Sequence, residues 1–160
     1  MKKLCTLVLA LLLVFVLVPA AWAAQDDGHW ADSSIARCEE LGLLSGMQAS
    51  TTNLDLKLPR GEMFKLMDNV MRYQQKATNA FTDLDSAYAH YDVVLKLVQA
   101  GVVTGYEDGT IQATGPITRE EAIVLFARMF HLEENASAAQ SFTDSGSIGE
   151  WAKPLVGAMK

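Results

Sequence analysis

Cysteine and histidine are scarce in this 160-residue chain, which holds two cysteines and three histidines. Cys5 lies in the apolar N-terminal segment, so Cys38 alone belongs to the rest of the chain and cannot form an intramolecular disulfide there. His29, His90 and His131 are far apart, and none belongs to a ligand pair at helical spacing. We therefore expect no metal site and no cofactor. We interpret Cys38 as a small buried hydrophobic residue, with an intermolecular disulfide as the alternative.

Long apolar runs are also absent, except at the N-terminus. A basic start, Met1–Lys3, precedes an uncharged segment, Leu4–Val18, and an Ala-Trp-Ala ending of the small-x-small kind that signal peptidase accepts. We predict a signal peptide over residues 1–23, whose removal leaves no stable membrane span. An uncleaved anchor over Leu4–Ala24 is the alternative, because this segment would just span a bilayer.

Positive charge is in deficit, with 13 basic against 19 acidic residues. Loss of the two lysines of the signal peptide would leave 11 basic residues and make the balance still more acidic. Such a chain does not attract nucleic acid or an acidic membrane surface through its bulk charge. Any anionic ligand must therefore be held by a local site.

The chain repeats itself at an offset of 59 residues. Residues 42–47 (GLLSGM) superpose on residues 101–106 (GVVTGY), so that the glycines and the apolar pair match. The same register aligns Arg60 with Arg119, and the glutamates two positions further on with each other. A register kept over roughly 36 residues indicates a duplicated structural unit.

Each complete unit has the pattern of a helix, a loop and a second helix. In the second unit, apolar residues with 3.6-residue periodicity stop at Gly101, a natural position for a left-handed cap. A tight turn follows between Gly105 and Gly109, and the next helix is predicted to start at Thr118. This helix carries an apolar stripe wide enough to need covering by another repeat. The stripe includes Phe126, Met129 and Phe130.

A third copy of the unit is incomplete. Residues 142–144 (FTD) repeat residues 81–83, and Trp151 with the following alanine repeats Trp30 with its own. No third glycine turn and no matching second helix follow. We predict an all-α fold of tandem helix-loop-helix repeats, two complete and the third truncated. The expected boundaries are 24–73 for repeat 1, 81–131 for repeat 2 and 142–160 for repeat 3.

These motifs resemble S-layer homology (SLH) repeats. The second unit carries the pattern most fully, with its Phe-Thr-Asp opening, its glycine turn and the Thr-Arg-Glu-Glu run that ends at Glu121. The family's usual form of that run is Thr-Arg-Ala-Glu, so Glu120 replaces an alanine. The first unit is weaker, because Pro59 stands where threonine is usual.

The resemblance implies three helical repeats packed as a pseudo-threefold spindle, which this chain would form in part. It further implies a noncatalytic anchoring module, secreted to the bacterial cell wall or cell surface. Its partner would be an acidic, possibly pyruvylated, secondary cell-wall polysaccharide or peptidoglycan-linked glycan, bound in grooves between repeats. The alternative is a protein-interaction or assembly module that self-associates, so that another subunit completes the third repeat.

The candidate ligand residues follow from the start of each second helix. Thr118 and Glu121 have the spacing of a capping box, which accounts for both residues without a ligand. A positive charge in the first helical turn opposes the helix dipole, but beside free amides it suits an incoming carboxylate. We therefore interpret Arg119 and Arg60 as ligand-binding, with a structural ion pair as the alternative. Glu62 is expected to be structural, like Glu121.

Three aromatic residues complete the candidate site. Trp30 and Trp151 could stack on a sugar ring, although a tryptophan repeated at one place in a helical repeat is more often a core residue. Tyr106 follows the Gly105 turn, where it could line a groove or pack on the surface.

Overall fold

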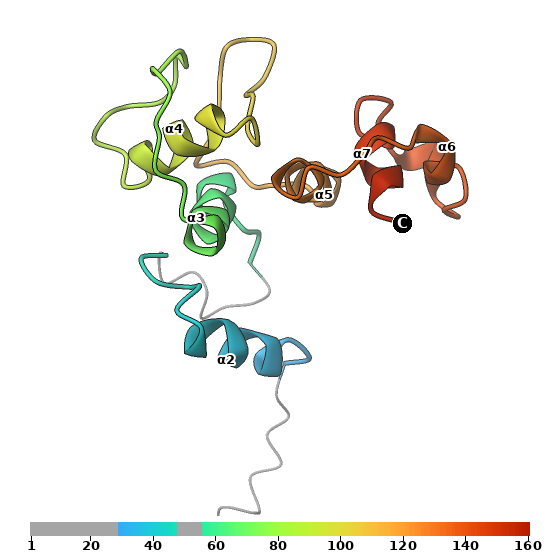
Figure 1. The fold of residues 1–160 in the computed structure, drawn as a ribbon, viewed down its shortest axis with the longest axis horizontal. Coiled ribbons are helices and arrows are strands. Elements are labelled where there is room, and N and C mark those ends of the chain that lie inside the picture. The colour runs from blue at the N-terminus through green and yellow to red at the C-terminus, as the bar shows by residue number, and fades with distance from the viewer. Residues whose placement is uncertain (1–28, 48–55) are drawn as a thin grey trace, which may run out of the picture. The chain divides into compact units, whose positions relative to one another are not determined.

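The computed structural model describes residues 29–47 and 56–160, and these residues form helices and no strand (Figure 1). The prediction of an all-α fold is therefore confirmed for the described part of the chain. The predicted signal peptide, residues 1–23, lies outside it. The elements are α2 (Asp32–Glu40), α3 (Arg60–Met71), α4 (Tyr91–Gln99), α5 (Arg119–Met129), α6 (Ala136–Ala139), the 3-10 turn η3 (Ser145–Ser147) and α7 (Lys153–Ala158).

The chain divides into two compact units, residues 1–35 and 36–160. Helix α2 crosses this boundary and has no buried residue. Cys38, predicted to be buried, is therefore only half-buried. The apolar core lies in residues 36–160.

The second helices of the two predicted repeats begin in different ways. Helix α5 has Thr118 as its N-cap, and both hydrogen bonds of a capping box with Glu121 are present. Helix α3 follows Pro59, which offers no side-chain cap. Instead, the N–H groups of Arg60 and Gly61 donate to the carbonyl oxygens of Gly115 (2.8 Å) and Ala113 (2.7 Å). Backbone from repeat 2 thus satisfies donors that α3 would otherwise leave unpaired.

Positions related by the 59-residue offset share unusual backbone conformations. Gly42 and Gly101 have φ of 68° and 73°, and both follow the end of a helix as left-handed caps. The residues that follow α3 and α5, Arg72 and His131, have φ of 54° and 52°, although neither is a glycine. The turns that end the helices are therefore locally alike in the two units.

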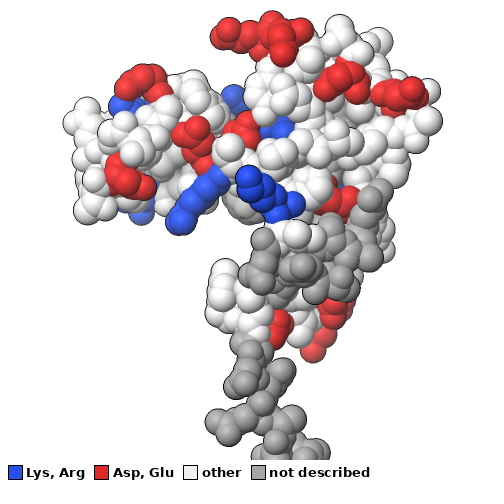
Figure 2. Space-filling model, turned by 180° about the vertical axis from the view of Figure 1, so that it is seen from behind, with Lys and Arg blue, Asp and Glu red and all other residues white. Residues whose placement is uncertain are grey.

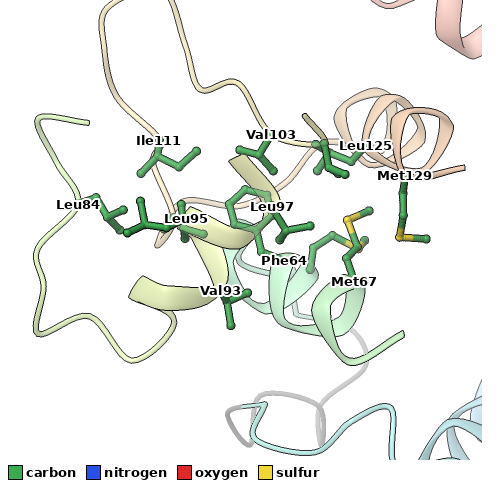
Figure 3. Close-up of a cluster of buried hydrophobic side chains, with 14 residues drawn as sticks. Phe64, Met67, Leu84, Val93, Leu95, Leu97, Val103, Ile111, Leu125 and Met129 are labelled. Carbon is green, nitrogen blue, oxygen red and sulfur yellow. The ribbon is translucent and has the colours of Figure 1, made fainter. Parts of the chain in front are cut away.

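The main core joins three helices and the loops between them (Figure 3). Phe64 and Met67 point from α3 toward Leu97 of α4, and Leu125 and Met129 reach them from α5. Each fully buried side chain of this size contributes on the order of 1.5–3 kcal/mol, so a single helical hairpin gains too little to be stable alone. The loop residues Val102, Val103 and Ile111 close the cluster.

A smaller apolar cluster joins the other face of α5 to the C-terminal segment. Val124 is buried there with Ala152 and Val156 of the α7 region. The apolar stripe predicted on α5 is largely covered, because Met129 is 1% exposed and Phe126 is half-buried. Phe130 alone of the three stays exposed, stacked on Phe126 at 6.5 Å between ring centroids.

Candidate functional site

The start of α3 carries a buried arginine. The Arg60 side chain is 7% exposed and its Nη1 lies 3.0 Å from Oε1 of Glu121. Its Nε–H donates to the carbonyl oxygen of Ile111 (3.1 Å), and its guanidinium lies 4.7 Å from the centroid of the Tyr106 ring. Arg60 is therefore an ion-pair partner within the fold, and its charge is already paired with that of Glu121.

Glu121 connects this ion pair to the start of α5. Its Oε2 accepts from the Thr118 N–H (2.8 Å), and its Oε1 accepts from the Tyr106 hydroxyl (2.5 Å). Burial by itself would raise the pKa of Glu121, but these hydrogen bonds and the charge of Arg60 together lower it below the usual value. Burial and the bond to Glu121 raise the pKa of Tyr106 to about 12. Tyr106 thus stays protonated at neutral pH and acts as a donor.

The Phe-Thr-Asp motif shapes the loop that carries Tyr106. The Asp83 carboxylate accepts from the N–H groups of Ile111 and Gln112, both at 2.8 Å. Gly105 has φ of 75°, and a Cβ there would lie 2.4 Å from Cε1 of Phe81. The Phe-Thr-Asp motif and the glycine turn thus contact each other in the structure.

A cleft of about 550 Å³ opens beside this cluster. We call it the Tyr106 cleft. It brings together three of the five predicted ligand residues: Arg60, Tyr106 and Trp151. Glu107, Glu120 and Arg128, which sequence analysis did not select, line it as well. Its volume is within the range of small-molecule sites.

Arg119 has surroundings opposite to those of Arg60. It is exposed and makes no hydrogen bond or ion pair with any described residue, so the predicted alternative of a structural ion pair does not form. It lines a second pocket of about 290 Å³ with Phe142, Asp144 and Ile148, which we call the Arg119 pocket. The two arginines that the repeat aligns thus differ in burial and in partners.

Trp30 and Trp151 are exposed, so their interpretation as core residues is wrong. Trp30 is 87% exposed and belongs to the unit of residues 1–35. Trp151 is 55% exposed, because the small cluster at this end buries its neighbour Ala152 and not the indole. Trp151 therefore offers its ring to the Tyr106 cleft.

The residues predicted to be structural are Glu62 and the turn glycines. Glu62 is buried, and its Oε1 lies 2.9 Å from Nε2 of His90. Gly101, Gly105 and Gly109 all have positive φ, as the predicted turns require. Sequence reasoning missed His90 because its role depends on a contact between two repeats.

Arg128 is a further residue that sequence reasoning missed. Its Nη1 donates to the Val102 carbonyl oxygen (3.4 Å) and to Oγ1 of Thr104 (3.3 Å). The residue 59 positions earlier is Asn69, whose Nδ2 donates to the carbonyl oxygens at the equivalent positions, Leu43 (2.7 Å) and Ser45 (2.8 Å). Comparing the two aligned positions, arginine and asparagine, would have been the signal for this residue.

The surface around these sites is electrostatically mixed. Figure 2 shows basic side chains gathered near the middle of one face and acidic side chains mostly along its upper part and edges. Within residues 29–47 and 56–160, no group of three or more His, Cys, Asp or Glu is placed to hold a metal ion. The helices of the same residues are too short or too polar to cross a bilayer.

Comparison with known proteins identifies the segment that carries the glycine turn. Residues 80–123 match the family model described as the S-layer homology domain. An S-layer protein of Bacillus thuringiensis subsp. finitimus is 31% identical over 84 residues, 52% of this chain and 10% of that protein. The outer membrane protein SlpA of Deinococcus radiodurans is 40% identical over 50 residues, 31% of this chain and 4% of that protein.

A third relative is longer in its match but weaker in identity. The exoglucanase XynX of Acetivibrio thermocellus is 26% identical over 135 residues, 80% of this chain. The match covers 12% of that enzyme, so this chain corresponds to a small part of each of the three relatives. The segment that holds Asp83, Tyr106 and the start of α5 thus matches the S-layer homology domain over residues 80–123.

Proposed function

We propose that this protein is a noncatalytic anchoring module that acts outside the cell and binds an acidic cell-wall polysaccharide. The S-layer homology domain and the S-layer relatives support a cell-surface anchoring module. The proposed ligand is a secondary wall polymer whose sugars carry carboxylate groups. The proposed architecture of the module is a partial spindle of two full repeats and one truncated repeat.

The exposed guanidinium of Arg119 is the observation that carries this proposal. Arg119 is the first residue of α5, next to backbone N–H groups at the positive end of the helix dipole. The absence of a carboxylate partner among the described residues leaves its two-pronged face available for a bidentate contact. The Phe142 and Ile148 side chains give the Arg119 pocket apolar walls against which a sugar ring can pack.

Arg60 takes a different part in the proposal. Its ion pair with Glu121 holds the loop of Tyr106 against the start of α3, so we assign it to the framework of the site. The chain thus uses one of its two aligned arginines for stability and the other for recognition.

The test is co-sedimentation of the full chain with wall sacculi. Arg119→Ala is expected to lower the apparent affinity for the sacculi at least tenfold, since a bidentate charge-assisted contact is lost. The affinity is read from the fraction of protein that sediments with the sacculi. Arg37→Ala is the matched control, because Arg37 is also a helical, exposed arginine but pairs with Glu40 at 2.7 Å. Circular dichroism checks that both variants keep their helices.

A second arm identifies the ligand class. Sacculi that have been chemically stripped of their secondary polymer are expected to bind neither the wild type nor the variants. Equal sedimentation of wild type and Arg119→Ala with native sacculi would refute the role of Arg119. Equal sedimentation of the wild type with native and stripped sacculi would refute the ligand.

A further inference from the structure

Two cavities of this chain meet at the same two side chains. Arg128 and Trp151 line the Tyr106 cleft, and both also line a third cavity of about 450 Å³. The other walls of that cavity include Gly101, Leu132 and Pro154, and we call it the Leu132 pocket. A ligand longer than one pocket would therefore pass over Arg128 and Trp151.

Arg128 has more hydrogen-bonding capacity than its place in the fold requires. One nitrogen, Nη1, makes both contacts with the 102–104 loop, at 3.4 and 3.3 Å. Asn69 contacts the two aligned loop residues with a single amide group and at shorter distances, although its second acceptor is the Ser45 carbonyl oxygen and that of Arg128 is the Thr104 hydroxyl. One N–H₂ group at this position thus suffices for the loop. The remaining guanidinium donors and the positive charge of Arg128 are available to bind a ligand.

Arg128 offers a carboxylate a cation to pair with, although Glu107 and Glu120 line the same cleft and Glu134 lines the Leu132 pocket. Arg60 and Glu121 neutralise each other, and Oε2 of Glu120 accepts from the Gly149 N–H (3.0 Å). Arg128 is thus the cation of the Tyr106 cleft that has no carboxylate partner among the described residues. Because Glu107 and Glu120 also line the cleft, it suits a chain of mostly neutral sugars with isolated carboxylates better than a densely charged polyanion.

Trp151 provides a fixed flat surface next to this charge. Its indole lies against Gly149, where an added Cβ would be 2.5 Å from Nε1 and 2.9 Å from Cδ1. The hydrogen bond to Glu120 holds Gly149 in turn on α5. More than half of the side chain nevertheless stays exposed, and an aromatic face that costs no further ordering suits the apolar face of a pyranose ring.

We infer that Arg128 and Trp151 form a sugar-acid subsite, distinct from the Arg119 pocket, in which one carboxylated unit of a glycan sits. The glycan chain extends from this unit into the Tyr106 cleft on one side and the Leu132 pocket on the other. The class of ligand rests on the proposed function, whereas the site and its two residues do not. The chain would then contact its polysaccharide at more than one place.

The test follows the fluorescence of Trp151. In the full chain, Trp22→Phe and Trp30→Phe leave Trp151 as the single tryptophan. The probe is the polysaccharide released from wall sacculi, used in its native form and after reduction of its carboxyl groups to alcohols. The native polysaccharide is expected to change the emission saturably, and the reduced one to bind at least tenfold more weakly.

The variant Arg128→Asn separates recognition from folding. It installs the residue that stands at the aligned position 69, where an amide donates to the carbonyl oxygen of Leu43, the residue aligned with Val102. The helical circular dichroism should therefore stay unchanged while affinity for the native polysaccharide falls at least tenfold. Trp151→Leu, at an exposed position, gives a second variant whose loss of affinity is read by sedimentation.

The outcomes distinguish this inference from the proposed function. Unchanged affinity of Arg128→Asn, or equal binding of native and carboxyl-reduced polysaccharide, would overturn the subsite. A silent Trp151 together with loss of sedimentation in Arg119→Ala would overturn the subsite and leave the anchoring function intact. A Trp151 response that Arg128→Asn weakens, together with normal sedimentation of Arg119→Ala, would support the subsite and refute the role of Arg119.

Discussion

The ion pair between Arg60 and Glu121 gives the sharpest test of how the two repeats hold together. Arg60→Met keeps the length of the side chain but removes the charge, the hydrogen bond to the Ile111 carbonyl and the contact with the Tyr106 ring. Removal of one partner from a buried pair typically costs 3–5 kcal/mol. Glu121 keeps its bonds from Thr118 and Tyr106, so we expect the lower end, about 3 kcal/mol in the free energy of unfolding.

The measurement is urea unfolding followed by circular dichroism. With a slope of about 2 kcal/mol per molar urea, a loss of this size lowers the midpoint by about 1.5 M. Arg119→Met is the matched control, because the same residue type stands at the equivalent repeat position but is exposed and has no ion-pair partner within residues 29–47 and 56–160. Its expected change is within about 0.5 kcal/mol. The reasoning fails if the two substitutions lower the midpoint equally.

Two further predictions concern the residues that surround this pair. The folded-state pKa of Glu121 is lowered, so its stabilising contribution is complete above pH 4.5, the ordinary value for glutamate, and is lost as the pH falls through the lower folded value. Urea midpoints measured from pH 6 to pH 3 should therefore decline less in Glu121→Gln than in the wild type, and parallel curves would contradict this. Gly105→Ala should destabilise by about 1–2 kcal/mol more than Gly101→Ala in urea unfolding: both glycines have positive φ, but only at Gly105 does the added Cβ meet Phe81 and the Thr110 carbonyl. Equal losses would show that backbone conformation alone decides both.

The sequence was sufficient for the features that depend on local chemistry. The capping residue Thr118 and the helix end before Gly101 were predicted from short patterns, since each depends on neighbours within a few residues. The all-α class followed from the 3.6-residue periodicity. The truncated third repeat over residues 142–160 stays a prediction; the structure places the six-residue α7 within it.

The differences between equivalent positions could not be predicted in this way. Arg60 and Arg119 occupy the same place in the pattern, but only Arg60 is covered by the loop of the following repeat, through Ile111 and Tyr106. Burial at these positions depends on what packs against them from more than 50 residues away. The exposure of Trp151 was misjudged for a related reason, because a repeated tryptophan is placed by its neighbours and not by its own hydrophobicity.

The first amides of α3 are satisfied by backbone of the following repeat, and this bears on how such modules can be transferred between proteins. Because the first amides of this helix bond to carbonyl oxygens of residues 113 and 115, a fragment that stops after residue 73 would expose those donors and lose the covering of Arg60. The smallest portable piece is therefore a pair of neighbouring copies. A fusion of the first copy alone to another protein would leave the first amides of α3 without their acceptors. A fusion that includes both copies would keep these hydrogen bonds.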